Sequence, residues 1–395
     1  MRFRWLGILI IWLVLILVIL EAGLRLVGPS LSGQIGIVSR YVTTGQPYEE
    51  DWNRAWQENI DHYYTLRPDI EDALQYGSPT VSFRLTTNKL WDDGLPPDEG
   101  IGFRNPPVDY AVDAVVVGDS FGFCFTERAD CWVDQLAANM DMGIVNLSQP
   151  VTGSLSHLKM LQDFGTPLEP PLVIWQFFGN DFNDDYGLLE WRGDIDPIPD
   201  ENASDENVSG DAGSIGDWMR RNWLTYAVIE TVMTGQWSGL PEEQQMFAPM
   251  YTQRIGMNYT LEFGKLYERT ALDMSRPANQ FGLEQSRDAF EQAQALVESW
   301  GGRLVVVIIP TREEVYDYMT ERVMGKEELD KHRSARQAMN NLCSDLALDC
   351  LDLFTEFQNR VRQGEFLYYG DDMHLNPEGN AAMAEVLENW LATLN

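Results

Sequence analysis

Two distant stretches of the chain carry the residue types of a serine nucleophile and its base. Ser120 ends the sequence Gly118-Asp-Ser directly after the apolar run 111–117, and His374 follows Asp371 by three positions near the C-terminus. A hydroxyl becomes a strong nucleophile when an imidazole removes its proton, and a carboxylate holds that imidazole in the required orientation. This pattern predicts that Ser120 attacks a carbonyl carbon, with His374 as the general base and Asp371 as the residue that orients His374.

Further positions offer hydrogen-bond donors for the negative charge that such an attack creates. Asn180 lies in a Gly-Asn-Asp sequence after the apolar run 172–178, and Gly153 follows the run 143–147. Side-chain amides and backbone N–H groups stabilise an oxyanion, and a glycine lets the backbone approach a ligand closely. We therefore expect an oxyanion hole made of the N–H groups of Ser120 and Gly153 and the side chain of Asn180.

The elements that must position these residues are recognisable as short apolar runs. Five runs are typical of buried parallel strands: 111–117, 143–147, 172–178, 303–310 and 349–354. Helical patterns lie between them, for example at 131–140 and 333–347. This alternation predicts an α/β, doubly wound parallel sheet, in which residues after the strands meet at one edge.

The connection between the third and fourth predicted strands is too long for one crossover. We interpret residues 184 to about 300 as an insertion that caps the active cleft. Within it, 194–211 holds seven acidic residues and no Lys or Arg, which is typical of a solvated loop. Three stretches of the insertion have helical patterns: 215–235, 242–270 and 283–300.

The N-terminus carries a long apolar segment. Sixteen apolar residues run from Trp5 to Leu20, and the apolar character continues to Val27. A helix over 1–27 is long enough to cross a bilayer, and Arg2 and Arg4 favour a cytoplasmic N-terminus with the rest of the chain outside the cell membrane. The alternative is a cleaved signal peptide. The predicted organisation is an anchor at 1–27, a stalk and lead-in segment at 28–110, and a catalytic domain at 111–395.

Composition excludes several classes of protein. The formal net charge of -33 would repel a phosphate backbone, so we expect no nucleic-acid partner. A hydrophobic fraction of 44% supports a packed core and excludes global disorder. Only four histidines occur, so we expect no multi-histidine metal site and no cofactor.

The four cysteines form two pairs, each seven residues apart in the sequence. An even number of cysteines in an exported chain predicts local disulfides, Cys124–Cys131 and Cys343–Cys350. Other pairings and buried free thiols are the alternatives, while the spacing disfavours a zinc site.

Taken together and in order, these motifs resemble the SGNH, or GDSL-like, esterase and lipase superfamily. The matching blocks are Gly-Asp-Ser at 118–120, Gly153, Gly-Asn-Asp at 179–181 and Asp-x-x-His at 371–374. The resemblance covers about residues 111–395 outside the insertion. The segments 173–185 and 100–105 are similar to a membrane-anchored bacterial branch of the superfamily. The resemblance implies a flavodoxin-like, three-layer α/β/α fold and the Ser120, His374 and Asp371 triad.

Two positions depart from the pattern of this superfamily. The glycine of the second block usually follows its Asn by five residues, where this chain has Val151. The backbone N–H of either Val151 or Gly153 is therefore the expected oxyanion donor. Cys124 stands soon after Ser120, where relatives more often have a small residue, and a disulfide to Cys131 would hold the loop beside the nucleophile.

Several motifs have competing interpretations. Gly118-x-Ser120-x-Gly122 also fits the nucleophile elbow of α/β-hydrolases, but Ser120 follows the first strand of the predicted sheet. Asp181, Asn183 and Asp185 imitate the start of a calcium loop that lacks the required Glu at its end.

The remaining histidines are assigned no catalytic role. We expect His157 on a helix in a surface or packing role and His332 on a solvated helix face, and His62 has no partner motif.

Three functions remain open at this stage. The first is an extracytoplasmic, membrane-anchored serine esterase that removes acyl groups from a cell-surface carbohydrate or lipid ester. The second is an O-acyltransferase that modifies an exported polysaccharide together with a multi-spanning membrane partner. The third is a non-catalytic surface binding protein. The sequence predicts no particular substrate-binding residues.

Overall fold

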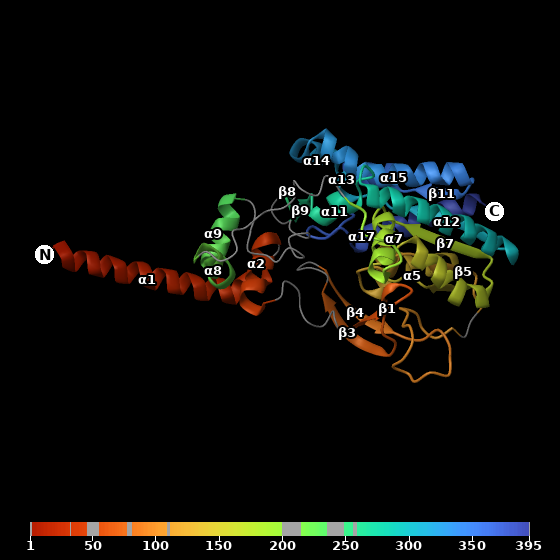
Figure 1. Ribbon diagram of the computed structural model, residues 1–395, viewed down its shortest axis with the longest axis horizontal. Coiled ribbons are helices and arrows are strands. Elements are labelled where there is room, and N and C mark those ends of the chain that lie inside the picture. The colour runs from red at the N-terminus through yellow and green to blue at the C-terminus, as the bar shows by residue number, and fades with distance from the viewer. Residues whose placement is uncertain are drawn as a thin grey trace.

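The computed structural model describes residues 2–31, 33–45, 55–76, 81–108, 111–199, 215–234, 249–255 and 259–394. An α/β domain holds most of this chain, and a long N-terminal helix projects from one end of it (Figure 1).

The α/β domain is built on one five-stranded parallel sheet. Its strands lie within the five apolar runs: β5 (Ala114–Val117), β6 (Ile144–Asn146), β7 (Leu172–Phe177), β10 (Arg303–Ile308) and β11 (Asp349–Asp352). They are ordered β11-β10-β7-β5-β6, which is the flavodoxin-like order. The predicted fold class is therefore confirmed. The strands β5, β6, β7 and β10 are mostly apolar and buried because helices cover both faces of the sheet, whereas the edge strand β11 begins and ends with Asp and is only partly buried.

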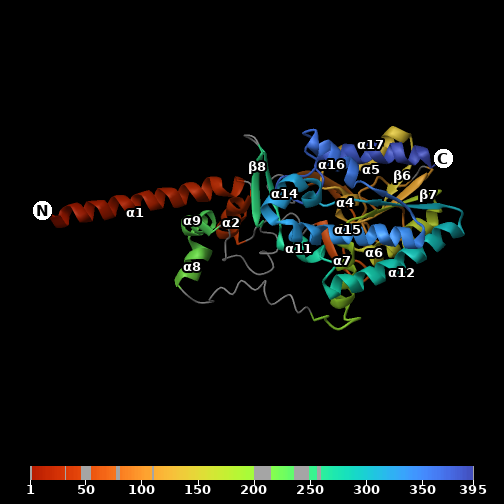
Figure 2. The ribbon, with the colours of Figure 1, turned by 90° about the horizontal axis from the view of Figure 1, so that it is seen from above.

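Helices form a layer on each face of the sheet, as Figure 2 shows. One layer contains α5 (Trp132–Met140) and α17 (Pro377–Thr393), which pack on each other. The other layer contains α6 (Ser154–Met160), α7 (Asp181–Arg192), α12 (Pro277–Ser299) and α15 (Lys326–Leu346). This arrangement follows from right-handed crossovers on either side of β5. Shorter helices at the sheet edges are α4 (Ser120–Phe123), α13 (Arg312–Val315), α14 (Asp317–Met324) and α16 (Phe354–Arg362).

The lead-in segment forms two antiparallel hairpins. They consist of β1 (Trp56–Asn59) with β2 (Tyr63–Leu66), and β3 (Ile70–Tyr76) with β4 (Ser82–Thr87). Alternate residues of β4 are buried, and they pack with Phe123 and Phe125 in a second hydrophobic cluster. The hairpins thus lie against the loop that follows the nucleophile.

One predicted helix of the insertion between β7 and β10 is mostly replaced by strands. Most of the described part of 242–270 is not helical: it forms the antiparallel pair β8 (Tyr251–Ile255) and β9 (Tyr259–Phe263), and only its end is helical, in α11 (Leu266–Ala271). The reason is local, because each strand begins with Tyr-Thr and ends with Ile or Phe, and β-branched and aromatic residues favour strands. The predicted helices at 215–235 are α8 (Ile215–Asn222) and α9 (Leu224–Thr234).

The last predicted helix of the insertion is part of the α/β domain. The stretch 283–300 lies within α12, which packs on α7 and β10 as a layer of the α/β domain. Most of the predicted acidic loop 194–211 falls outside the described residues.

The N-terminal segment forms α1 (Arg2–Val27) and α2 (Gly33–Thr44). The stretch Gly7–Ser30, with a mean hydropathy of 2.8, is long and apolar enough to cross a membrane, and it is the one helix of this kind among the described residues. Its orientation in a membrane stays a prediction.

Candidate active site

The segment that carries Ser120 is held in place by a side chain of the central strand β7. Ser120 begins α4 directly after β5, and Gln176 of β7 accepts hydrogen bonds through Oε1 from the N–H groups of Asp119 (3.0 Å) and Gly122 (2.9 Å). A Cβ atom on Gly118 would lie 2.4 Å from Gln176 Oε1, so the close approach requires glycine there. The first block is therefore shaped by its contact with β7.

His374 lies beside Ser120. Its Nε2 is 2.7 Å from Ser120 Oγ, and its Nδ1 contacts Asp372 Oδ1. The imidazole ring stacks on Phe125 at 4.2 Å between ring centroids, which limits its rotation. Three side chains thus form a hydrogen-bonded series from Ser120 through His374 to Asp372.

This series corrects the predicted acid. The structure places Asp372, rather than Asp371, at Nδ1 of His374. A tight turn causes the difference, because the N–H of His374 also donates to Asp372 Oδ1 at 2.9 Å and brings that carboxylate back toward the ring. The carbonyl oxygen of Asp371 instead accepts a hydrogen bond from Lys265 Nζ at 2.6 Å.

The charges at the site suit a serine nucleophile. Burial raises the pKa of Asp372, but the adjacent His374 outweighs burial and holds that pKa well below its ordinary range. Asp372 is therefore ionised at neutral pH and can accept a hydrogen bond from Nδ1 of His374. Burial raises the pKa of Asp119 to about 6, although its Oδ1 accepts a hydrogen bond from the N–H of Phe121.

A buried arginine holds the turn that carries Asp372. Arg312 Nη1 donates to the carbonyl oxygen of Asp372 at 2.7 Å, and it also lies 3.3 Å from the carbonyl oxygen of Tyr369. Arg312 Nη2 lies 3.5 Å from Glu313 Oε1 and 3.8 Å from Glu268 Oε1. Sequence analysis missed this role because Arg312 is 60 positions from Asp372 in an unremarkable Thr-Arg-Glu-Glu sequence.

The same cluster is the one group of metal-ligand type that we find within the described ranges. The ligand atoms of Glu268, Glu313 and His332 lie within 4.8 Å of one another. The guanidinium of Arg312 already provides the positive charge beside both carboxylates, so these residues fit an internal ion cluster better than a metal site. Burial raises the pKa of Glu268 well above its ordinary value, and the adjacent carboxylate of Glu313 raises it further.

His332 is buried, which contradicts its predicted place on a solvated helix face. Its neighbours Lys331 and Arg333 are only partly buried and form ion pairs at the helix surface, whereas His332 faces inward toward Glu313. A single helical residue can face the core between two charged neighbours, because successive side chains point about 100° apart.

The three expected oxyanion donors lie in the loops that follow β5, β6 and β7. Gly153 is the N-cap residue of α6, and a Cβ atom there would lie 2.5 Å from the carbonyl oxygen of Asp181, which explains the glycine. Val151 has φ of 60°, a left-handed conformation that β-branched residues rarely adopt. Asn180 Nδ2 donates to Asp184 Oδ2 at 2.7 Å and to the hydroxyl of Tyr267 at 3.1 Å. The assignment of these donors stays a prediction.

A pocket of about 370 Å³ adjoins the loop of the second block. Its lining combines aromatic, amide and acidic side chains from the start of β2, the 151–153 loop and the helices α6 and α7. These residues are His62, Tyr63, Val151, Thr152, Gly153, Ser156, Asn183, Asp184, Gly187, Leu188, Glu190 and Trp191. Tyr63 and Trp191 meet edge to face at 5.0 Å between ring centroids. The lead-in segment thus contributes to the pocket, which no sequence motif indicated.

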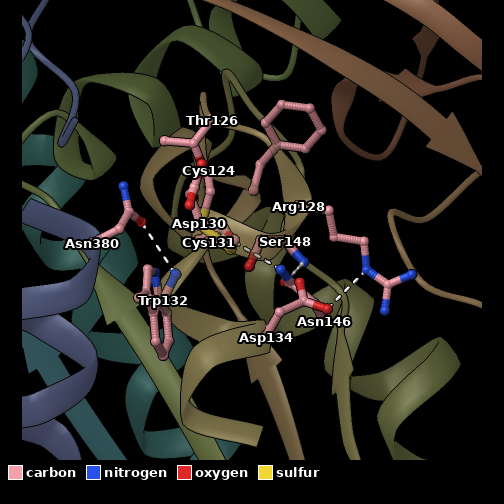
Figure 3. Close-up of a disulfide and its surroundings, with 12 residues drawn as sticks. Cys124, Thr126, Arg128, Asp130, Cys131, Trp132, Asp134, Asn146, Ser148 and Asn380 are labelled. Carbon is pink, nitrogen blue, oxygen red and sulfur yellow. Dashed lines mark hydrogen bonds and ion pairs between the residues drawn. A yellow bond between two sulfur atoms is a disulfide. The ribbon is translucent and has the colours of Figure 1, made fainter. Parts of the chain in front are cut away.

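Both predicted disulfides are present. Cys124 and Cys131 connect the end of α4 to the start of α5 (Figure 3). Next to this bridge, Trp132 Nε1 donates to the carbonyl oxygen of Phe121 at 2.9 Å, and the N–H of Trp132 donates to Asn380. The bridge therefore holds the loop beside Ser120. Cys343–Cys350 connects α15 to β11.

A buried arginine from the lead-in segment holds the same loop from the other side. Arg104 donates to the carbonyl oxygens of Phe123, Cys124 and Thr126, and it lies over the ring of Phe83. This contact explains the Arg in the 100–105 motif.

The calcium-loop interpretation does not fit the structure, and the packing role expected for His157 does. Asp181, Asn183 and Asp185 lie on the helix α7, not in a calcium loop, and Asp185 accepts hydrogen bonds from Leu155 and Ser286. His157 is buried and lies 3.1 Å from Thr152 Oγ1 through Nε2, so it packs inside the protein.

Comparison with known proteins supports the same family. Residues 266–394 match the family described as "SGNH hydrolase-like domain, acetyltransferase AlgX". Residues 266–394 therefore resemble an SGNH hydrolase-like domain. The predicted superfamily is thereby confirmed. None of the curated proteins matches the sequence.

The solved structures that match this chain include an acetyl xylan esterase, TesA and a lipase/acylhydrolase. The acetyl xylan esterase AlAXEase matches with a TM-score of 0.37 and 10% identity, over 71% of this chain and 98% of that chain. TesA matches with a TM-score of 0.35 and 12% identity, over 70% and 95%. The lipase/acylhydrolase from Enterococcus faecalis matches with a TM-score of 0.35 and 11% identity, over 71% and 95%. Similarity at this level gives no information about substrate.

Proposed function

We propose that this SGNH-like protein is an extracytoplasmic serine esterase, anchored by α1, that hydrolyses ester bonds of a cell-surface carbohydrate or lipid. The observation that carries the proposal is the hydrogen-bonded series of Ser120, His374 and Asp372, with Ser120 Oγ 2.7 Å from His374 Nε2. In this proposal Asp372 replaces Asp371 as the orienting acid.

The reaction proceeds through an acyl-enzyme. Ser120 Oγ attacks the ester carbonyl carbon while His374 Nε2 takes the hydroxyl proton, and ionised Asp372 stabilises the resulting imidazolium. The carbonyl oxygen becomes an oxyanion, which accepts hydrogen bonds from the N–H groups of Ser120 and Gly153 and from Asn180 Nδ2 once that amide releases Asp184 or Tyr267. Each such donor lowers the barrier by about 3 kcal/mol.

The second half of the reaction restores the serine. His374 gives its proton to the departing alcohol oxygen as the C–O bond breaks, which leaves the acyl group on Ser120. A water molecule then attacks the acyl carbon and gives a proton to His374. The product is a carboxylic acid, and the proton on His374 returns to Ser120 Oγ.

The pocket beside Gly153 is the expected place for part of the substrate. Aromatic rings such as Tyr63 and Trp191 offer flat apolar surfaces, and Asp184 and Glu190 offer hydrogen-bond acceptors for hydroxyl groups. This combination suits a sugar better than a plain hydrocarbon chain.

Acyl transfer to a sugar hydroxyl is the second candidate function. The observation in its favour is that the family matched by residues 266–394 is described as an acetyltransferase. The acyl-enzyme would be the same, and an acceptor hydroxyl would replace water in the second step. A donor-exporting, multi-spanning partner would then supply the acyl group.

Labelling by a fluorophosphonate tests the nucleophile. In detergent-solubilised full-length protein, intact mass should show one adduct for the wild type and none for Ser120→Ala or His374→Ala. Ser299→Ala is the matched control, because Ser299 is exposed on α12 and should leave labelling unchanged. A folded wild type without an adduct, or a labelled Ser120→Ala, would refute the proposal.

A series of short-chain esters separates the two candidate functions. Hydrolysis without any acceptor supports the esterase. Product formation that requires an added sugar acceptor, with acyl groups appearing on that sugar, supports the transferase.

A further inference from the structure

The helices α8 and α9 of the insertion return to the N-terminal helix α1. The Glu21 carboxylate accepts hydrogen bonds from the N–H of Leu224 (3.1 Å) and from the N–H (2.7 Å) and Oγ1 (2.8 Å) of Thr225. Arg25 Nη2 donates to the carbonyl oxygen of Asn222 at 2.8 Å. A side chain of α1 therefore caps the N-terminus of α9, about 200 residues away in the sequence.

One face of α9 is buried in this assembly. Leu224 and Ala227 are fully buried and pack with Val38 of α2 and with Leu24 of α1. Both views place α8 and α9 next to α1 and α2, away from the α/β domain (Figures 1 and 2). The docking is thus an apolar contact reinforced by the hydrogen bonds of Glu21 and Arg25.

The opposite face of α9 is apolar and exposed. Ile229, Val232 and Met233 have exposed fractions of 49%, 66% and 80%. They are spaced i, i+3 and i+4, so they lie on one side of the helix. Trp218 of α8 is also exposed, at 64%. A helix bathed in water on this side would carry polar residues here, so the face needs an apolar environment.

A groove between α1 and the start of α9 indicates that this apolar environment is the lipid bilayer. It has a volume of about 550 Å³ and lies between Trp223 and the α1 residues Val14, Leu17, Val18, Glu21, Ala22 and Arg25. Val14 is about 10 Å along the helix axis from Glu21, in the direction of the N-terminus. Trp223 therefore borders the part of α1 that a bilayer would enclose, and the start of α9 lies beside the candidate span.

We propose that α8 and α9 form a second, interfacial attachment to the lipid bilayer, with Ile229, Val232 and Met233 at the boundary between headgroups and acyl chains. Tryptophans such as Trp218 and Trp223 favour that boundary, and amphipathic helices lie in its plane. The proposal rests on α1 as the span and not on the esterase activity. Its consequence is a fixed height and orientation of the SGNH-like domain relative to the membrane.

Depth-resolved fluorescence quenching tests the proposal on the full-length chain. Since all four native cysteines are in disulfides, Val232→Cys provides a single thiol for an environment-sensitive NBD label in phosphatidylcholine–phosphatidylglycerol vesicles. We expect a blue-shifted emission, a severalfold loss of iodide quenching, and stronger quenching by headgroup nitroxides than by nitroxides deep in the acyl chains. Met233→Cys should behave in the same way.

Two control positions distinguish a failure of the interfacial attachment from a failure of the membrane span. Leu15→Cys, in the middle of α1, should be quenched most by deep nitroxides, and Asp288→Cys, exposed on α12, should remain open to iodide. An iodide-accessible label at Val232 with a buried label at Leu15 would overturn the interfacial attachment alone. Iodide access at both positions would overturn the attachment together with the span.

Discussion

His374 contacts Asp372 twice, through its backbone N–H, which donates to Asp372 Oδ1 at 2.9 Å, and through ring Nδ1, which meets the same oxygen. One carboxylate thus fixes both the turn and the imidazole. Asp371 precedes it directly, but its carbonyl oxygen is held by Lys265. The two adjacent acids therefore form a natural matched pair for mutagenesis.

We expect Asp372→Asn to lower kcat for ester hydrolysis by roughly 10³–10⁴, because the amide would favour the wrong imidazole tautomer. Asp371→Asn should lower kcat by less than about tenfold, since it leaves the carboxylate at Nδ1 in place. Steady-state kinetics on a short-chain ester measures both effects. A larger loss for Asp371→Asn than for Asp372→Asn would return the catalytic role to Asp371.

The buried Arg312 cluster should contribute strongly to stability. Arg312→Met removes the charge that faces Glu313 and Glu268 and should lower the free energy of unfolding by about 3–5 kcal/mol. Arg287→Met, which breaks the more exposed pair with Asp345, should cost less than about 1 kcal/mol. Urea denaturation of both variants provides the comparison, and equal losses would contradict the internal ion cluster.

The two disulfides should differ in their effect on activity. Each closes a loop of seven residues, so replacing either pair by Ser should cost about 2–3 kcal/mol of stability. Only Cys124→Ser with Cys131→Ser should also slow fluorophosphonate labelling, because that bridge follows α4 directly. Labelling rates that fall equally in the Cys343→Ser and Cys350→Ser variant would show that the effect is one of stability.

Asp185 should make stability depend on pH. Burial raises its pKa to about 7, although Ser286 and the N–H of Leu155 donate to it. Between about pH 4 and pH 7 the folded state then binds this proton more tightly than the unfolded state, so the contribution of Asp185 to stability falls as the pH rises.

Asp185→Asn removes the charge; its amide oxygen can still accept from the N–H of Leu155, and its NH2 group can donate to Ser286 Oγ in place of the bond that Ser286 now donates. We expect it to stabilise the protein on the order of 4 kcal/mol at pH 8 and to have little effect at pH 4. Asp288→Asn, an exposed change on α12, should show no such difference. Unfolding curves at the two pH values measure it, and a gain from Asp185→Asn that is the same at both would argue against a raised pKa.

The pocket beside Gly153 should affect substrate binding more than chemistry. Trp191→Ala removes one of its two aromatic walls and should raise KM for a sugar ester roughly tenfold, while kcat for a minimal acetate ester stays within about twofold. Tyr318→Ala, an exposed aromatic residue on α14, is the control and should change neither constant. An unchanged KM in Trp191→Ala would place the sugar elsewhere.

Much of the fold and of the candidate site follows from local sequence patterns. Buried parallel strands favour apolar runs, and each of the five strands lies within a predicted run, although the edge strand β11 includes Asp349 and Asp352 and is only partly buried. Ser120 and His374 were identified because each stands in a short motif after its own strand. The disulfides followed from an even number of cysteines and equal spacing. These features depend on neighbours in the sequence, so the sequence by itself determined them.

Other features depend on which distant segments meet. Whether Asp371 or Asp372 reaches His374 is decided by a turn that Arg312 and Lys265 hold from other parts of the chain. His332 is buried because α15 turns that residue toward Glu313. The pocket needs a hairpin strand from the lead-in segment beside α7. Such choices rest on contacts between residues far apart in sequence, whose energies have no local signature, and only the tertiary structure decided them.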